Sequence, residues 1–469
     1  MGLRYLSVQT LLALMGVAIA VLALLPPAAA QINIALPPIA GLISRPGDFQ
    51  PLPDAKPVHQ VVDAESCEPV DHEVLWARLP LTLRDVSLRE MVGQLLVVSY
   101  SGTSPNAKGV GIARDALRRS EIGGVLTFRH NIASGAQTQA INEMFLNAHP
   151  VLPALIAVDQ EGGAVMRVKP SEGGPATPSA EKIAQGTVAE AEEAYGEMAN
   201  ALAKLGFTVN FGPVVDLAVN PKNPVIARFG RSFGSAPREV VRYASAFIAA
   251  HKDAGIATSL KHFPGHGSSS DDSHESATDL TPTWSDDELI PFAELIKQGL
   301  ADMIMMGHLK LDGVSGPGDL PASLSPIAID GVLRSKLCFE GLVVSDDLAM
   351  DAIESHWGTP EAAQLVFEAG GDIVLVSLPA GKGMTLVREI TDHLVAKAEQ
   401  DPSLAQRIRE AYARVVHHKL AMASIRKEWR DANAASVLAA SLPTAAIPRP
   451  RPTTGRDLAP TDGTRSEGE

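Results

Sequence analysis

The stretch GLVVSDDLAM, residues 341–350, joins a short apolar run to two adjacent aspartates. An apolar, β-branched run that follows a glycine and ends in polar residues is consistent with a buried β-strand. Neighbouring side chains on a strand point to opposite faces, so the two carboxylates are expected to diverge at its tip. We therefore expect Asp346 to face a pocket, and Asp347 to bond backbone groups or to cap the next helix.

Further runs of the same kind occur along the chain, and amphipathic stretches such as residues 188–206 and 237–255 separate most of them. Strands that alternate with helices predict a parallel sheet with both faces covered, and eight such units predict an α/β fold of the (β/α)8 TIM-barrel type. A doubly wound open sheet is the alternative, but neither GxGxxG nor GxxxxGK[ST] follows any run. The other runs are QLLVVSY (94–100), GGVLTF (123–128), ALIAVD (154–159), FTVNFG (207–212), IATSLK (256–261), DMIMMG (302–307) and DIVLVS (372–377).

Polar residues follow five of these runs at their carboxyl ends. One such residue alone is better explained as a polar group that ends a strand. The carboxyl ends of barrel strands converge in space, however, and barrel enzymes place their chemistry there. Polar residues at five ends together therefore indicate a catalytic site. They are Asp159, Asp216, Lys261, His262, His308, Asp346 and Asp347.

The N-terminal region differs in composition from the rest of the chain. Arg4, an apolar run at 11–25 and a small-residue exit predict a signal peptide at residues 1–30. An uncleaved anchor helix is the alternative, although a full span needs roughly 20 apolar residues. We expect export to the periplasm or the exterior, with no stable membrane span after cleavage. Residues 31–80 are rich in proline and predict a leader that precedes the fold.

The main domain is expected at residues 81–425, a length that suits one large α/β domain. Residues 426–469 are rich in Ala and Pro and predict a disordered tail. The net charge of −14 and the 4% aromatic content argue against nucleic acid as a partner. With only Cys67 and Cys338, a cysteine-based metal site is excluded, and whether the two residues pair stays open.

The segment KHFPGHGSSSDDSHES, residues 261–276, gathers three histidines on a backbone rich in Gly, Pro and Ser. A metal site is one interpretation, but Pro264 and Gly265 break any helix that would align His262 with His266. An acid/base site is the second interpretation, and a polar loop without a chemical role is the third. In an extended loop residues i and i+2 face the same way, so a carboxylate two residues before His274 can orient its imidazole. We favour the acid/base interpretation and expect no metal.

Taken together, eight segments resemble the family-3 glycoside hydrolases, and in particular their single-barrel β-N-acetylhexosaminidase branch. The resemblance covers roughly residues 85–425. The combination of KHFPGHG, a following Asp-x-His and a later Ser-Asp-Asp is specific for this family. None of these three motifs is specific by itself. The segments are AVDQEGGAVMRV (157–168), NFGPVVDLAVNP (210–221), GRSFG (230–234), LKHFPGHG (260–267), DDSH (271–274), MGHL (306–309), LPASLSP (320–326) and VVSDDLAM (343–350).

The resemblance implies a retaining hydrolase that needs no cofactor. It implies Asp346 as the nucleophile, His274 as the general acid/base and Asp272 as the partner of that histidine. Many family members take the acid/base from a second domain, but here we expect it to come from the barrel itself. The resemblance also implies sugar-binding roles for Asp159, Arg167, Arg231, Lys261 and His262.

The implied substrate is a carbohydrate, namely terminal β-linked GlcNAc on muropeptides or their sugars, with a role in peptidoglycan turnover. Two alternatives stay open: another family-3 β-glycosidase such as a β-glucosidase, and a sugar-binding barrel without catalysis. Ala164 stands where close relatives often carry a basic residue. We therefore expect the contact with a second sugar or a peptide to differ from that in those relatives.

Overall fold

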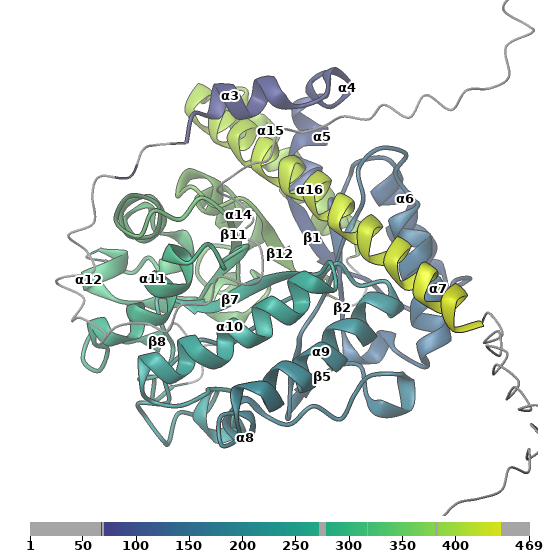
Figure 1. The fold of residues 1–469 in the computed structure, drawn as a ribbon. Coiled ribbons are helices and arrows are strands. Elements are labelled where there is room, and N and C mark those ends of the chain that lie inside the picture. The colour runs from purple at the N-terminus through teal and green to yellow at the C-terminus, as the bar shows by residue number, and fades with distance from the viewer. Residues whose placement is uncertain (1–66, 68–69, 272–277, 317, 380–382, 442–469) are drawn as a thin grey trace, which may run out of the picture. The chain divides into compact units, whose positions relative to one another are not determined.

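The computed structural model describes residues 67, 70–271, 278–316, 318–379 and 383–441 (Figure 1). All of them belong to one unit of the chain, Ser44–Glu469. The predicted signal peptide, most of the predicted leader, and Asp272 and His274 lie outside the described residues.

The eight predicted strands are present and form one parallel sheet, which confirms the (β/α)8 barrel. Their order is β11-β9-β7-β6-β3-β2-β1-β12, and a bridge between Val344 and Ile373 joins the two edge strands. Every residue of these strands is buried, as expected for a parallel sheet covered by helices. The strands are β1 (Leu96–Ser99), β2 (Gly124–Thr127), β3 (Leu155–Val158), β6 (Val209–Asn210), β7 (Ala257–Phe263), β9 (Met303–Met306), β11 (Leu342–Ser345) and β12 (Val374–Val376).

The helices around the barrel begin and end at residues whose side chains suit those positions. In the helix Val188–Leu205, Thr187 and Glu190 form a capping box, and Gly206 ends the helix with a positive φ of 94°. The helices are α5 (Leu88–Gln94), α6 (Lys108–Arg118), α7 (Gly135–Leu146), α9 (Val188–Leu205), α10 (Pro237–Asp253), α11 (Ile290–Lys297), the π-helix η6 (Ile327–Lys336), α14 (Thr359–Glu368) and α15 (Met384–Ala398).

Shorter elements fill the loops. At the carboxyl side of the barrel, β4 pairs with β5, and β8 pairs with β10. The short elements are α3 (His72–Arg78), α4 (Leu81–Arg84), α8 (Ala180–Ile183), α12 (Asp312–Ser315), α13 (Asp351–Glu354), β4 (Gln160–Gly162), β5 (Val165–Met166), β8 (Thr278–Asp279), β10 (Leu309–Lys310), η1 (Arg129–Asn131), η2 (Pro170–Glu172), η3 (Ala227–Phe229), η4 (Asp286–Leu289) and η5 (Ala322–Leu324).

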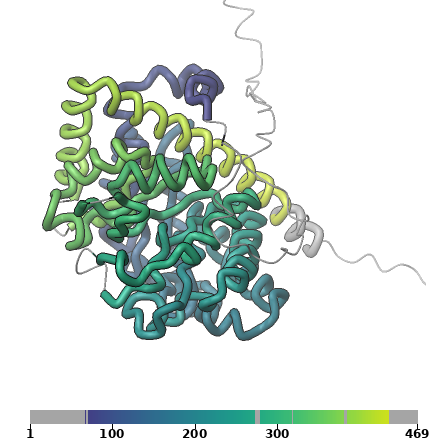
Figure 2. Tube along the Cα trace, turned by 90° about the vertical axis from the view of Figure 1, so that its left-hand side faces the viewer, coloured from purple at the N-terminus to yellow at the C-terminus, as the bar shows by residue number. Residues whose placement is uncertain are grey.

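The last helix, α16 (Pro402–Ser441), crosses the N-terminal face of the barrel (Figures 1 and 2). Lys419 Nζ donates to Gln94 Oε1 and to the Gly123 carbonyl, both at 2.7 Å, and Arg426 donates to the Phe207 carbonyl. These acceptors precede β1, β2 and β6, so buried cations of α16 bond the beginnings of three strands. Burial lowers the pKa of Lys419 to about 7.

Two boundaries differ from the predicted ones. The helix α16 continues past residue 425 to Ser441, because its alanine-rich sequence favours helix and Trp429 packs against the core. The helix α3 begins within the predicted leader, where Asp71 caps its first turn. No helix in the described part of the chain is long and apolar enough to cross a membrane.

The two cysteines form a disulfide, which settles the question that the sequence left open. Cys67 and Cys338 are bonded with their Cα atoms 5.5 Å apart and 271 residues apart in the chain. The bond ties the segment before α3 to the turn that leads into β11. That strand ends at Ser345, directly before the two aspartates of the opening motif.

A buried carboxylate joins three elements at the start of β12. Asp372 accepts hydrogen bonds from Arg334 Nη2 at 2.7 Å, Val343 N at 2.8 Å and Arg414 Nε at 2.6 Å. Because Asp372 is fully buried, its charge depends on these partners. The network connects η6, β11 and α16.

We predict that Asp372→Ala lowers the free energy of unfolding by about 3 kcal/mol, because two largely buried guanidinium groups lose the counter-charge of a fully buried carboxylate. Asp392→Ala serves as the control, since Asp392 pairs with Arg89 at 2.6 Å with both side chains more than half exposed. That pair is expected to contribute less than about 1 kcal/mol. Denaturant titration measures both values, and equal losses would contradict the role assigned to Asp372.

Candidate active site

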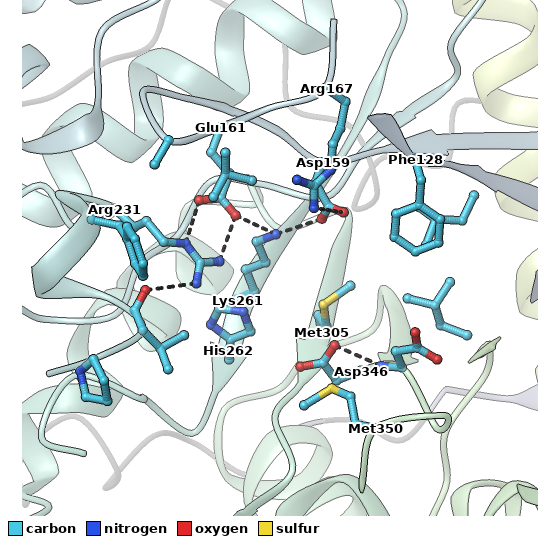
Figure 3. A pocket seen from close by; sticks show the side chains of 18 residues that line it. Phe128, Asp159, Glu161, Arg167, Arg231, Lys261, His262, Met305, Asp346 and Met350 are labelled. Carbon is cyan, nitrogen blue, oxygen red and sulfur yellow. Dashed lines mark hydrogen bonds and ion pairs between the residues drawn. The ribbon is translucent and has the colours of Figure 1, made fainter. Parts of the chain in front are cut away.

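A pocket of about 470 Å³ opens at the carboxyl ends of the strands. The predicted site residues that fall in the described part of the chain all line it, although they come from segments far apart in the sequence (Figure 3). Their convergence agrees with the placement expected from the barrel topology. These residues are Asp159, Arg167, Arg231, Lys261, His262 and Asp346.

The polar side of the pocket is built around Glu161, a residue of β4. Its carboxylate accepts two hydrogen bonds from Arg231, from Nε and Nη2, both at 2.8 Å. Lys261 Nζ lies 2.7 Å from the same carboxylate and donates to Asp159 Oδ1 at 3.0 Å. Arg167 Nη2 reaches Asp159 Oδ2 at 3.4 Å. Figure 3 shows this chain of ion pairs along one wall.

Glu161 and Lys261 are buried, so the charge of each depends on its neighbours. Burial alone would raise the pKa of Glu161, but the charges of Arg231 and Lys261 hold it well below its ordinary value. Burial alone would lower the pKa of Lys261, but Asp159 and Glu161 raise it. Glu161 and Lys261 are therefore both ionised at neutral pH, and their charges are fixed in place before a ligand binds.

A second buried carboxylate, Asp216, fixes His262 and the start of the loop after β7. Its Oδ2 accepts from His262 Nδ1 at 2.7 Å, and its Oδ1 accepts from the backbone N–H groups of His262 and His266 at 3.0 and 2.8 Å. A carboxylate only accepts, so Nδ1 of His262 carries a proton and the ring is held in one orientation. Asp216 itself does not line the pocket.

Asp346 and Asp347 both line the pocket, but their carboxylates have different surroundings. Asp346 Oδ1 accepts from the backbone N–H of Asp347 at 2.8 Å. Asp347 Oδ1 accepts from the backbone N–H groups of Ala349 and Ser377, at 3.0 and 2.8 Å. The expectation that Asp347 bonds backbone groups is thus confirmed. Burial raises the pKa of Asp347, against the effect of these hydrogen bonds.

His308, at the tip of β9, holds the peptide that carries these aspartates. Its Nε2 donates to the Asp347 carbonyl at 3.1 Å, and its Nδ1 lies 2.8 Å from Ser323 Oγ. Since a carbonyl only accepts, Nε2 carries the proton that makes this bond. The buried His308 thus links the MGHL and LPASLSP segments to the Asp346–Asp347 turn rather than entering the pocket.

Apolar side chains line the rest of the pocket. Met305 and Met350 lie beside Asp346 in Figure 3, and Phe128, Leu126 and Leu375 also line the pocket. A pocket that offers both polar and apolar side chains suits a sugar ring, whose hydroxyl groups need hydrogen-bond partners while its C–H groups do not.

The proposed acid/base pair, Asp272 and His274, lies outside the described residues, but the loop leading toward it is well held. Asn223 Nδ2 donates to the carbonyls of His266 and Gly267 at 2.7 and 3.2 Å, and Asn220 Nδ2 donates to the Ser269 carbonyl at 2.8 Å. The loop after β7 therefore begins in a fixed position against residues 220–223.

Glu161 is the site residue that the sequence did not single out. It follows Asp159 by two positions in the segment AVDQEGGAVMRV. Its place just after the end of a strand is the feature of the sequence that could have identified it. Its role depends on pairing with Lys261 and Arg231, which lie 100 and 70 residues away in the sequence. Sequence patterning within one segment cannot reveal such a pairing.

A closed (β/α)8 barrel with carboxylates, cations and apolar side chains around a pocket at its strand tips is the architecture of a barrel enzyme that acts on a polyhydroxylated substrate. Residues 87–417 match the glycosyl hydrolase family 3 N-terminal domain. The chain therefore belongs to glycosyl hydrolase family 3.

Relatives with known names agree with this assignment. The β-hexosaminidase LpqI of Mycobacterium tuberculosis is 36% identical over 305 residues, which cover 62% of this chain and 73% of that one. A β-hexosaminidase of Stenotrophomonas maltophilia is 34% identical over 296 residues, covering 61% and 84%.

Solved structures show the same fold. A family 3 β-N-acetylglucosaminidase from Paenibacillus superposes with a TM-score of 0.64 and 32% identity, covering 73% of this chain and 63% of that one. A β-N-acetylhexosaminidase from Beutenbergia cavernae gives a TM-score of 0.65 and 30% identity, covering 71% and 99%.

We predict that Glu161→Gln lowers the free energy of unfolding by about 3 kcal/mol at pH 7, because Lys261 and Arg231 lose the charge that compensates theirs. The folded protein holds the pKa of Glu161 below the ordinary value of 4.5, so its contribution is full above that pH and declines as the pH falls further. The difference between wild type and variant should therefore shrink below pH 4.5.

Denaturant titration at several pH values measures this difference. Glu193→Gln, which removes an exposed carboxylate from α9, is the control and should change little at any pH. A difference for Glu161→Gln that is independent of pH would contradict the electrostatic explanation.

Proposed function

We propose that the protein is a retaining β-N-acetylhexosaminidase that releases terminal β-linked GlcNAc from peptidoglycan fragments. Membership of family 3 makes the chain a glycoside hydrolase with a carbohydrate substrate. The observation that carries the finer proposal is that Asp346 and five candidate sugar-binding residues line one pocket. Relatives named β-hexosaminidase and β-N-acetylglucosaminidase support the choice of sugar.

The proposed reaction is a double displacement. The Asp346 carboxylate attacks the anomeric carbon while His274 donates a proton to the departing oxygen. The glycosyl-enzyme ester is then hydrolysed by water, from which His274 removes a proton. The backbone N–H of Asp347, 2.8 Å from Asp346 Oδ1, orients the attacking carboxylate. The hydrogen bond from His308 to the Asp347 carbonyl holds the peptide that carries this N–H group.

An imidazole suits the acid/base role for two reasons. Its ordinary pKa near 6.5 allows proton exchange in both directions near neutral pH. It also adds no further negative charge near Asp346, beside which the carboxylate of Asp347 already lies. The anchoring of the loop after β7 by Asn220 and Asn223 supports delivery of His274 from the barrel itself.

The ion-pair wall supplies the groups that would hold the sugar. Asp159 accepts hydrogen bonds from sugar hydroxyls, and Lys261 and Arg167 donate them. His262, whose Nδ1 donates to Asp216, offers its Nε2 to a sugar hydroxyl. Because Glu161 and Asp216 already fix Lys261 and His262, these groups do not need to be ordered when substrate binds.

We predict that Asp346→Asn lowers kcat for a nitrophenyl β-GlcNAc substrate by about 10³-fold or more, since an amide is a poor nucleophile. His274→Ala should lose about 10²–10⁴-fold with alcohol leaving groups, and less with dinitrophenyl, which leaves without a proton. Steady-state and burst kinetics measure both.

The matching nitrophenyl β-glucoside is the control for sugar choice, and it should react much more slowly with the wild type. An Asp346→Asn variant at full rate would remove the nucleophile assignment. A His274→Ala variant with equal losses on all leaving groups would remove the acid/base assignment.

Export to the periplasm or the exterior is part of the proposal. The basic and apolar N-terminal segment suggests it, and the disulfide between Cys67 and Cys338 supports it, because such bonds persist in oxidising compartments. A location outside the cytoplasm would place the enzyme beside the cell wall that supplies its substrate.

We predict that protein taken from its native cells in the presence of an alkylating reagent carries no alkyl group on either cysteine, as mass spectrometry would show. Reduction should lower the free energy of unfolding by about 2–4 kcal/mol, because the bond closes a long loop in the unfolded chain. Alkylation of both cysteines in the native sample would contradict export.

A further inference from the structure

A fully buried glutamine separates two residues of the ion-pair wall. Gln160 stands between Asp159 and Glu161 in the chain, and its exposed fraction is 0%. Neighbouring side chains on a strand point to opposite faces. In agreement with this rule, Asp159 and Glu161 line the pocket whereas Gln160 does not. The side chain of Gln160 therefore extends behind the pocket, into the interior of the protein.

The Gln160 side chain holds the segment that carries Arg167. Its Oε1 accepts from the backbone N–H groups of Arg167 and Val168, at 2.8 and 2.9 Å, and its Nε2 donates to the Val168 carbonyl at 2.9 Å. These three bonds fasten the end of β5 to β4. One buried side chain thus sets the position of the Arg167 backbone relative to the backbones of Asp159 and Glu161.

The backbone of Gln160 is held in turn by Asn210, the last residue of β6. Asn210 Oδ1 accepts from the Gln160 N–H, and Asn210 Nδ2 donates to the Gln160 carbonyl, both at 2.9 Å. Only one orientation of the side-chain amide satisfies both of these bonds. Asn210 is also 0% exposed, so water cannot replace a bond that is lost here.

The amide of Asn210 also reaches a histidine of helix α10. Asn210 Nδ2 lies 2.9 Å from His251 Nε2, and His251 Nδ1 lies 2.8 Å from the Phe247 carbonyl. Because a carbonyl only accepts, Nδ1 carries the proton and Nε2 accepts from Asn210. Burial lowers the pKa of His251 to about 4, so Nε2 keeps its lone pair at neutral pH. The ring of Phe247 stacks on the imidazole with the two centroids 4.1 Å apart, which fixes its plane.

We propose that His251, Asn210 and Gln160 form a buried positioning network that sets the geometry of the ion-pair wall. None of the three lines the pocket, so they act on a ligand only through Arg167 and the two wall residues that flank Gln160. The network joins α10 and β6 to the β4–β5 hairpin, which is thus held from behind as well as by its ion pairs. The inference rests on the proposed function and deepens it by naming residues outside the pocket that determine affinity for the sugar.

The first variant removes the far end of the network. His251→Leu deletes the acceptor for Asn210 but leaves both bonds between Asn210 and Gln160. It should raise KM for nitrophenyl β-GlcNAc, and the dissociation constant of free GlcNAc, by about threefold to tenfold, the size of one lost hydrogen bond. The value of kcat should change by less than about twofold, because the wall binds the ground state and the transition state alike.

Two further variants test the chemistry of the network. His251→Gln places an amide oxygen near the position of Nε2 and should restore most of the affinity. Asn210→Asp keeps the acceptor for the Gln160 N–H but puts a second oxygen against the Gln160 carbonyl, so it should raise KM at least as much as His251→Leu does. Its carboxylate can pair with a protonated His251, which makes it the variant to use if His251→Leu does not fold.

A purely structural role predicts a different pattern. A variant that is only less stable contains less folded protein, which lowers the apparent kcat and leaves KM unchanged. His417→Leu is the matched control, since His417 is also buried and donates from Nε2 to the Leu75 carbonyl at 2.8 Å. It lies on α16, at the other end of the barrel, and its removal should leave KM unchanged.

Hydrogen exchange gives a readout that needs no sugar. The N–H groups of Gln160, Arg167 and Val168 are all bonded within the network. Their exchange, followed by mass spectrometry of peptides that cover residues 160–168, should be faster in His251→Leu than in the wild type. It should not be faster in His417→Leu.

The outcomes separate the two proposals. If the wild type hydrolyses no β-GlcNAc substrate, the proposed function fails, and exchange in residues 160–168 still decides the network. If the wild type is active but KM is unchanged in both His251→Leu and Asn210→Asp, the positioning network is overturned. Unchanged exchange in these variants, or an equal rise of KM in His417→Leu, would also overturn it.

Discussion

One carboxylate compensates two buried cations, and the site depends on that compensation. Glu161 lies between Lys261 and Arg231 at distances of 2.7 and 2.8 Å, with all three side chains almost fully buried. Buried charges are costly unless they are paired, so the arrangement fixes these residues before a ligand arrives. The short hairpin of β4 and β5 brings Glu161 into place directly after Asp159. Through Glu161 of β4, ion pairs join Lys261 of β7, Asp159 after β3 and Arg231 after η3.

The two ends of the barrel have separate tasks. The N-terminal end is closed by α16, whose Lys419 and Arg426 bond groups that precede three strands, and by Asp372 with its two arginines. The carboxyl end carries the pocket and the loops. This division is usual in (β/α)8 barrels, where one face serves stability and the other chemistry. Asp346 and Asp372 illustrate it, since they lie at opposite ends of neighbouring strands.

Much of the fold was predictable, because its signals are local. Each of the eight strands is a short apolar run, and α9 carries its capping box and terminal glycine in sequence. The convergence of Asp159, Lys261 and Asp346 followed from the topology alone. The bonds of Glu161 and the Cys67–Cys338 disulfide were not predictable, because they depend on distances between residues far apart in the chain. The extent of α16 was missed because the packing of Trp429 against the core depends on contacts that the local sequence does not reveal. The roles of Asp272 and His274 remain predictions.

The pocket rim and the buried cations of α16 lie at opposite ends of the barrel, and this separation matters for engineering. Residues 160–167 and 220–229 shape the pocket without touching the buried cations that hold the strand beginnings together. Libraries that keep Glu161, Asn220 and Asn223 and randomise only exposed positions of these loops, such as Ala164, therefore leave the scaffold's main source of rigidity intact. Such a scaffold tolerates the loss of stability that new specificities usually bring, which makes the rim a natural starting point for directed evolution toward other glycosides.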